Sequence, residues 1–394
     1  MPDSNRSTRS SRKRPRQRLV IPVVAAAAAG VLGLTFLVTS PSGDGSVGLL
    51  TGGGQNSYGD DQDNDGDNND GDDQDNDGDN NDGDDQDNDG DGEDGEVVNE
   101  GPVEDDFVDI EEIEADNDEL DLGDTGTFTV DCGVNANGLF NSENVIVNPG
   151  APNGAQHVHD YVGNQDVNRF SEDVDANNEI LAQGNTTCDN NDRSMHYWPV
   201  LRDRTQEGRD ANQEGGGLDG NVGRILTPLE ATIEFRGNAQ EDVVPMPEFL
   251  QIITGNARAF TTDGENANAQ WTCTGFEDQI SGDKYPLCPE GSDVMRIMDF
   301  PSCWDGENIE SEDNRSHIVF PDEEDGSCPD DTQPVPQLRQ TLVYDVPEGP
   351  NFAVDGFPEE QHAPITDHSD FINVMPEDVM QEAVDCINEG QDCS

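Results

Sequence analysis

The acidic repeat over residues 60–95 most limits what this chain can fold into. A 12-residue sequence occurs there three times, as DDQDNDGDNNDG, DDQDNDGDNNDG and DDQDNDGDGEDG. Because these residues have almost no apolar surface to bury, the segment cannot offset the entropy of its own chain. We therefore expect a disordered, self-repelling linker over residues 41–124, with cations condensed loosely along it.

The same repeat carries a partial calcium-binding pattern. Each copy contains DQDNDG, the first half of an EF-hand-type loop, which in the first copy makes Asp61, Asp63 and Asp65 candidate calcium ligands. The twelfth position does not supply a regular bidentate Glu, and no apolar helices flank the loops. Ordered calcium sites are therefore the alternative to a loosely solvated linker.

The N-terminus has the pattern of a membrane-targeting segment. Residues 1–18 hold seven of the 19 Lys and Arg residues, and residues 19–40 form an uncharged, mainly apolar stretch. That length is nearer to a spanning helix than to the core of a signal peptide, so we expect a transmembrane anchor, with a cleaved signal and a secreted protein as the alternative. The basic flank predicts a cytoplasmic N-terminus and an extracellular remainder.

The rest of the chain is acidic as well. From residue 125 onward it has 52 Asp and Glu against 12 Lys and Arg. Such a surface repels polyanions, so nucleic acid is excluded as a partner and the membrane is contacted only through the N-terminal segment.

Eight cysteines all lie in this C-terminal part. Their number is even and none forms a CxxC pair, which favours four disulfides in an oxidising compartment over a zinc site. The pairing stays open, with a local Cys386–Cys393 bridge as a guess. The cysteines are Cys132, Cys188, Cys273, Cys288, Cys303, Cys328, Cys386 and Cys393.

Residues 125–394 are predicted to form a single, mainly β domain, sandwich or jelly-roll-like, with long loops and one C-terminal helix. The helix is predicted over residues 376–388, where apolar residues recur at helical spacing behind Pro376. Residues 202–224 have the composition of a surface loop. Runs rich in β-branched and aromatic residues predict strands at 127–132, 144–148, 157–162, 231–236, 249–255, 294–300, 317–321 and 338–346.

Several motifs together resemble a known secreted family. These are HVHDYVG, CDNNDRSMHYW, FPSCWDG, SEDNRSHIVFP, GSCP, VPQL and HSDFIN, in this order over roughly residues 135–388. The set resembles the domain of unknown function numbered nineteen ninety-six, which is common in fungi, often beside WSC-type carbohydrate-binding modules, and also occurs in actinobacteria. The resemblance implies a secreted domain that acts at a cell surface or wall, of an actinobacterial type with an N-terminal anchor and an acidic linker. It implies no established activity.

The histidines are the best candidates for chemistry. His157 and His159 are two residues apart, as are His368 and Asp370, and on strands each pair points to one face. If the two segments face each other, these four residues form a candidate catalytic group. With His317 they form a candidate site for a divalent metal ion. The alternative is that these side chains only satisfy one another within a buried polar network.

Two functions from different classes remain open. One is a membrane-tethered domain that binds cell-wall or environmental polysaccharide, with Tyr197, Trp198, Trp271 and Trp304 as candidate sugar-stacking or core residues. The other is a secreted polysaccharide hydrolase or lyase that uses the His/Asp group, with or without a metal ion. The sequence favours the first, because it contains no recognised catalytic motif.

Overall fold

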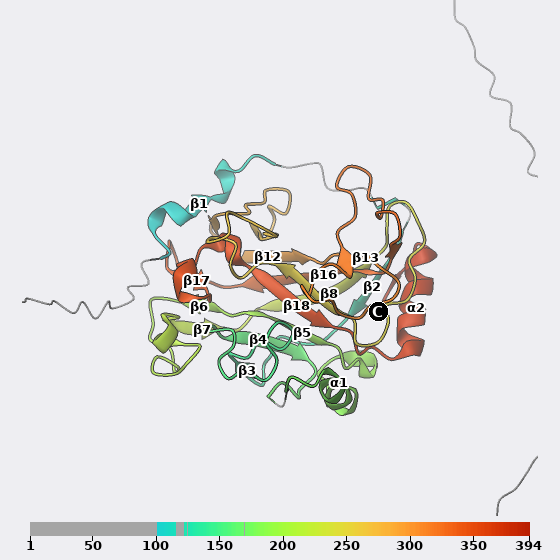
Figure 1. Ribbon diagram of the computed structural model, residues 1–394. Coiled ribbons are helices and arrows are strands. Elements are labelled where there is room, and N and C mark those ends of the chain that lie inside the picture. Colours follow the sequence, from blue (N-terminus) through green and yellow to red (C-terminus); the bar gives the residue numbers. More distant parts are fainter. Residues whose placement is uncertain (1–100, 116–121, 124, 169) are drawn as a thin grey trace, which may run out of the picture. The chain divides into compact units, whose positions relative to one another are not determined.

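The computed structural model describes residues 101–115, 122–123, 125–168 and 170–394 (Figure 1). The predicted anchor at 19–40, the acidic repeats and the calcium candidates Asp61, Asp63 and Asp65 lie outside the described residues. Within the described residues, no helix is both long enough and apolar enough to cross a bilayer.

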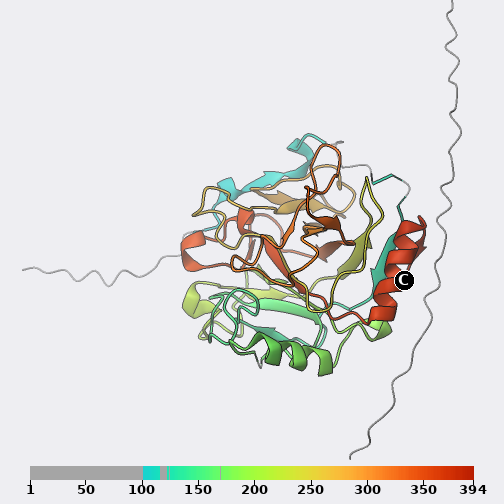
Figure 2. The same cartoon turned by 45° about the vertical axis from the view of Figure 1, so that its right-hand side comes forward.

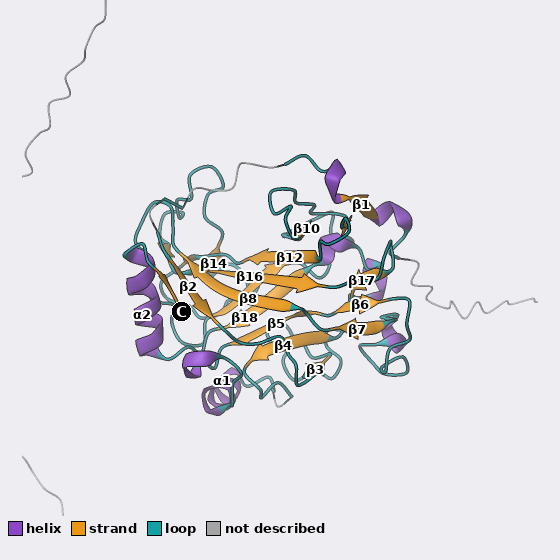
Figure 3. Cartoon of the chain, turned by 180° about the vertical axis from the view of Figure 1, so that it is seen from behind, coloured by secondary structure: helices purple, strands orange, loops and turns teal. Residues whose placement is uncertain are grey.

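Two larger sheets make up most of the domain, which is mainly β (Figure 3). Their strands are antiparallel except for the last pair of the first sheet, β2 and β19, which is parallel. The six-stranded sheet has the order β10 (Gln270–Cys273), β12 (Val294–Asp299), β16 (Gln337–Tyr344), β8 (Glu230–Arg236), β2 (Thr127–Val130) and β19 (Asp392–Cys393). The five-stranded sheet has the order β3 (Phe140–Asn141), β4 (His159–Gly163), β5 (Met195–Pro199), β18 (His368–Ile372) and β9 (Gln251–Gly255).

Three small sheets and short helices complete the described part. The sheets are β17 (Phe352–Val354), β6 (Leu201–Asp203) and β7 (Arg224–Leu226); β14 (Ile318–Val319), β13 (Cys303–Trp304) and β15 (Gln333–Pro334); and β1 (Phe107–Asp109) with β11 (Tyr285–Leu287). The helices are α1 (Val174–Gln183), α2 (Glu377–Asn388) and the 3-10 turns η1 (Glu104–Asp106), η2 (Ile110–Glu112), η3 (Asp189–Asn191), η4 (Gly217–Asp219), η5 (Pro358–Glu360) and η6 (Pro364–Thr366).

One hydrophobic cluster draws on both larger sheets. Phe235 of β8 and Leu338 of β16 belong to the same buried cluster as Trp198 of β5, Ile252 of β9 and Phe371 of β18. Burying a side chain of this size contributes about 1.5–3 kcal/mol, so this shared cluster dominates the stability of the domain. The opposite face of the five-stranded sheet has a second cluster, which includes Leu181 of helix α1.

Helix α2 begins after Pro376, as the sequence predicts, and lies beside β2 in Figures 1 and 2. Its apolar stripe is buried against the larger cluster through Met380, Ala383, Val384 and Ile387. The expectation of a single helix is corrected by α1. That ten-residue helix has a weak apolar stripe, because Asn177 and Asn178 are among its buried residues.

The eight cysteines form four disulfides, which are typical of an extracellular domain. The pairs are Cys132–Cys188, Cys273–Cys288, Cys303–Cys328 and Cys386–Cys393, so the expected local bridge is confirmed. This last bridge fastens β19 to helix α2. Beside it Gly126 passes so close to the chain that an added Cβ would lie 1.9 Å from the carbonyl oxygen of Gln391, which explains the glycine.

Two boundaries differ from the expectation. Residues 101–115, assigned to the linker, belong to the fold, because β1 pairs in parallel with β11. The segment 144–148 forms turns with one isolated bridge instead of a strand. The strands expected near residues 127, 157, 231, 249, 294 and 338 are present as β2, β4, β8, β9, β12 and β16, and the one near 317 is reduced to β14.

Candidate functional site

The order of strands in the five-stranded sheet brings the candidate histidines together. Tyr161, Tyr197, Asp370 and Ile253 lie directly opposite one another across β4, β5, β18 and β9. His159 and His368 lie two residues before Tyr161 and Asp370. His159 lies opposite Pro199, and His368 lies opposite Gly255. Because side chains two residues apart share a face, the two histidines and Asp370 point to the same side of the sheet.

His157, directly before β4, completes a compact histidine cluster with His159 and His368. One ring nitrogen of each lies within 4.8 Å of those of the other two, and Nε2 of His157 lies 3.0 Å from Nε2 of His159. All three side chains are buried. The structure therefore brings these three residues together.

Backbone carbonyls orient two of the three rings. Nδ1 of His159 lies 3.1 Å from the carbonyl oxygen of Glu143, and Nδ1 of His368 lies 2.9 Å from that of Thr366. A neutral imidazole donates from one nitrogen only, so these contacts place the proton on Nδ1 of both rings and leave Nε2 as an acceptor. In His159 that acceptor lies 3.0 Å from Nε2 of His157. Nδ1 of His157 is buried and has no hydrogen-bond partner among the residues that the structure describes.

Burial keeps the three rings neutral. It lowers the pKa of His157 well below its ordinary value, and the neighbouring His159 and His368 lower it further. Burial likewise lowers the pKa of His159 to about 3, with a contribution from His368, and that of His368 to about 4. Neutral imidazoles with free lone pairs are the form that binds metal ions.

Asp370 faces the same cavity as the histidine cluster. The cavity has a volume of about 150 Å³, and His157, His159 and His368 line it together with Asp370. Burial raises the pKa of Asp370 to about 7, against the opposing effect of the Arg315 guanidinium. A carboxyl group with this pKa exchanges protons near neutral pH, as a general acid or base requires.

Two arginines and a phenylalanine also line this cavity. Arg315 donates a hydrogen bond from Nη2 to the carbonyl oxygen of Gly255, at 2.7 Å. The Arg258 guanidinium lies 3.8 Å from the centre of the Phe357 ring, and that ring packs edge-on against His157. The cavity thus combines three neutral histidines, one titratable carboxyl group and two cations.

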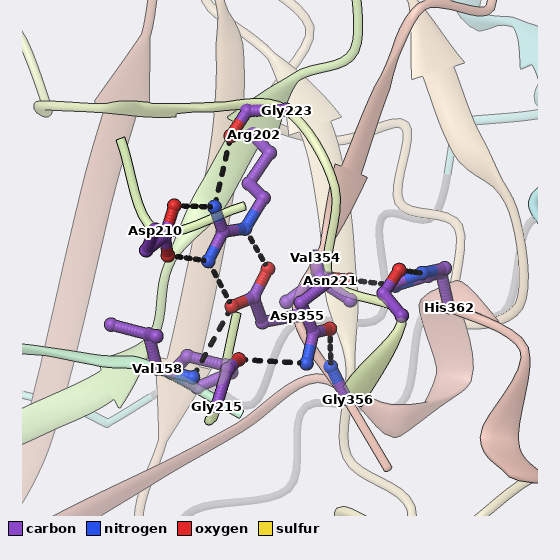
Figure 4. A network of polar contacts seen from close by, with 12 residues as sticks. Val158, Arg202, Asp210, Gly215, Asn221, Gly223, Val354, Asp355, Gly356 and His362 are labelled. Atoms are coloured by element: carbon purple, nitrogen blue, oxygen red, sulfur yellow. Dashed lines mark hydrogen bonds and ion pairs between the residues drawn. The ribbon is translucent and has the colours of Figure 1, made fainter. Parts of the chain in front are cut away.

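A buried polar network holds the segment around His157 (Figure 4). Arg202 Nε lies 2.5 Å from Oδ1 of Asp355, and Oδ2 of Asp355 accepts a hydrogen bond from the backbone N–H of Val158. Asn221 donates to the carbonyl oxygen of Gln156 and accepts from the N–H of Gly356. The residues on both sides of His157 are therefore fixed to the core.

A second buried ion pair supports His368. Arg296 pairs with Asp367, the residue directly before His368, and both side chains are fully buried. Arg296 also donates to the carbonyl oxygen of Pro199, at 3.0 Å, which ties β5 to the same guanidinium. These contacts fix the start of β18 relative to the neighbouring strand.

The structure does not bring His317 to the histidine cluster. Its Nε2 lies 2.7 Å from the carbonyl oxygen of Gln251, and its Nδ1 lies 2.9 Å from Oγ of Ser311. His196 lies on the other face of the sheet, where its Nδ1 is 3.1 Å from Nε2 of Gln340. Its neighbours Cys132 and Cys188 are joined in a disulfide and are not available as thiolate ligands.

The candidate aromatic residues prove to be mainly core residues. Tyr197, Trp198 and Trp271 are fully buried, so they cannot stack on a sugar. Trp304 is partly buried and donates to the carbonyl oxygen of Asn308.

Other contributors to the site were not identified from the sequence. Arg202 and Asn221 lie in the stretch 202–224 that was expected to be a surface loop, and no local pattern marks their distant partners. Arg258 and Arg315 were also missed. Basic residues are scarce in this acidic domain, and that scarcity could have drawn attention to them.

The molecule is thus a disulfide-bonded, mainly β domain with a buried histidine cluster in a small cavity. A family model described as "Domain of unknown function (DUF1996)" matches residues 144–374, more than half of the 394 residues, and the chain belongs to this family. The matched segment contains the whole histidine cluster. Neither the search of curated proteins nor that of solved structures found a match.

Proposed function

We propose that this chain is an extracellular, metal-dependent enzyme that cleaves polysaccharide as a hydrolase or lyase. In this proposal residues 19–40 anchor it in the membrane and the acidic linker extends the domain away from the cell. The observation that carries the catalytic part is the histidine cluster, which opens with Asp370 into one cavity. Polysaccharide binding, which the sequence favours, becomes a step of this activity.

The ligand set fits a divalent cation with a preference for imidazole, such as Zn²⁺. Two nitrogens bound to one Zn²⁺ at about 2.1 Å lie about 3.0–3.4 Å apart at bond angles of about 90–110°. The 3.0 Å separation between Nε2 of His157 and Nε2 of His159 agrees with this range. A cation bound there supplies Lewis acidity, polarising a substrate oxygen or acidifying a water molecule.

Asp370 is the proposed general base. Its pKa of about 7 means that a large share of the carboxyl groups is ionised at neutral pH, while the deeply buried site keeps them basic. In a hydrolase the carboxylate accepts a proton from the attacking water, and in a lyase it accepts one from a sugar carbon. Arg315, whose charge acts on Asp370, helps to balance the negative charge that develops in either reaction.

The first experiment measures metal binding. The purified protein is stripped with a chelator and titrated with Zn²⁺, Mn²⁺, Cu²⁺ and Fe²⁺, and His159→Asn is treated in the same way. Asn retains a donor for the Glu143 carbonyl but removes the Nε2 ligand, so the variant should keep the fold and lose the site. We expect one equivalent of metal in the wild type and at least a hundredfold weaker binding in the variant.

The matched control is His317→Gln, which changes a buried histidine outside the cluster and should leave metal binding unchanged. Activity is then followed as the release of new chain ends from polysaccharides, with and without metal, for the wild type and Asp370→Asn. A wild type that binds no metal, or a His159→Asn variant that binds it equally well, would contradict the proposal. So would full activity in Asp370→Asn.

A further inference from the structure

A second, larger cavity adjoins the histidine cavity. Its volume of about 520 Å³ lies within the usual range of about 300–1,000 Å³ for ligand sites. Ile253 and Arg315 line both cavities, so the two meet at these side chains. A third cavity, of about 860 Å³, shares no lining residue with the histidine cavity.

We propose that the cavity of about 520 Å³, here called the groove, binds a neutral polysaccharide and delivers it to the histidine cluster. The substrate class rests on the hydrolase form of the proposed function, because a neutral sugar lacks the carboxyl group that acidifies a ring C–H for a lyase. Binding in the groove is testable without it. The histidine cavity, at about 150 Å³, is too small to hold a polymer segment alone. The adjoining groove provides the missing room.

The charges along the groove favour an uncharged ligand. Three arginines line it, and so do Asp299, Asp322 and Glu323, so the formal charges cancel. Asp299 binds Arg339 through two short contacts, of 2.6 and 2.7 Å, which leaves little free charge at that pair. Because the domain around the groove is strongly acidic, a polyanion would be repelled before it reached the groove.

Amide side chains give the groove the donors and acceptors that sugar hydroxyls require. Asn268 donates to the carbonyl oxygen of Asp299, and Gln337 donates to that of Phe300. Gln270 donates to the Asp299 carboxylate. Each of these amides is held in place by its nitrogen, which fixes the position of its oxygen as an acceptor for a hydroxyl group.

Phe320 supplies an aromatic face. It lines the groove, and 41% of its surface is exposed, although it belongs to the apolar run that includes buried Ile318. An exposed aromatic ring beside fixed amides is the usual combination for one face of a sugar ring, which is apolar through its C–H groups. Phe260 is similarly exposed, at 49%, but lines neither cavity, and it is therefore the matched control.

Arg315 lies at the junction between the two cavities. Within the described part of the chain its guanidinium makes one hydrogen bond, to the carbonyl oxygen of Gly255, which leaves most of its N–H groups for a ligand. We therefore assign Arg315 as the positioning residue that holds the sugar unit between the groove and Asp370. Its replacement by Gln should raise KM and lower kcat together.

The experiment compares polymers on metal-free protein, so that the result does not depend on the histidine cluster. Retention in affinity gels is measured with the neutral polymers laminarin, mannan, galactomannan and soluble starch, and with the acidic polymers alginate and polygalacturonate. We expect at least one neutral polymer to bind and neither acidic one. Phe320→Ala should weaken binding about tenfold, Phe320→Trp should restore it, and Phe260→Ala should leave it unchanged.

Three results would overturn the inference: tighter binding of an acidic polymer, no binding of any neutral polymer, or equal binding by wild type and Phe320→Ala. The metal titration above is independent of all three. Failure of the proposed function would thus appear as lost metal binding with intact polymer retention, and failure of the groove as the reverse.

Discussion

Acid should destabilise this domain through its histidine cluster, and His368 allows that effect to be measured. Burial lowers its folded-state pKa to about 4, whereas an unfolded histidine has a pKa of about 6.5. Below pH 6.5 the unfolded chain binds a proton that the folded protein does not. The contribution is therefore fully present above pH 6.5 and is lost as the pH falls toward 4.

The magnitude follows from the gap between the two pKa values. Each pH unit below 6.5 costs about 1.4 kcal/mol per group, so at pH 5.0 His368 alone lowers the free energy of unfolding by about 2 kcal/mol. His368→Asn removes this group and retains a donor for the Thr366 carbonyl. The difference in unfolding free energy between wild type and variant should shrink by about 2 kcal/mol between pH 7.5 and pH 5.0.

The assay is urea denaturation of metal-free protein at both pH values, followed by circular dichroism. Asp370 works in the opposite direction, because its pKa of about 7 favours the folded state at low pH, but it is present in both proteins and cancels in the comparison. Ile372→Val, a core change on the same strand, should show a difference that does not vary with pH. A constant difference for His368→Asn as well would mean that His368 is charged in the folded protein, and the argument for a neutral ligand set would fail.

Three other measurements test the energetics. By calorimetry, Zn²⁺ at 100 times its wild-type dissociation constant should raise the unfolding free energy of the wild type by about 2.7 kcal/mol, and that of His159→Asn by at most about 0.4 kcal/mol. Arg202→Met leaves buried carboxylates without their cation and should cost about 3–5 kcal/mol in urea denaturation. Replacing Cys132 and Cys188 by Ala opens a 56-residue loop and should cost about 4 kcal/mol, against about 2 kcal/mol for the seven-residue C-terminal disulfide, in the same assay.

The sequence predicted those elements whose pattern is local. The strand around Ile233 and Phe235 alternates between buried and less buried positions, and helix α2 has a clear apolar stripe. Strands β5 and β18 were missed as strands because polar residues occupy buried positions in them, His196 in β5 and His368, Ser369 and Asp370 in β18. Helix α1 was missed because it buries asparagines where an apolar stripe is expected.

The candidate site was predictable only in part. The i, i+2 spacing placed His157 with His159, and His368 with Asp370, on common faces. Their convergence depends on β5 lying between β4 and β18, a pairing of distant segments that no local pattern encodes. For the same reason His317 was grouped with residues that it does not approach, and the support from Arg202 could not be foreseen.

The parallel pairing of β19 with β2 adds residues 392–393 to the edge of the six-stranded sheet. In the sequence β19 follows every other strand of that sheet, and in the fold it covers the edge that β2 would otherwise present. A polypeptide that lacked β19 would carry β2 as an unprotected edge, open to association with a second copy. The Cys386–Cys393 bridge fastens this cover to helix α2, so its reduction would free β19 and expose that edge.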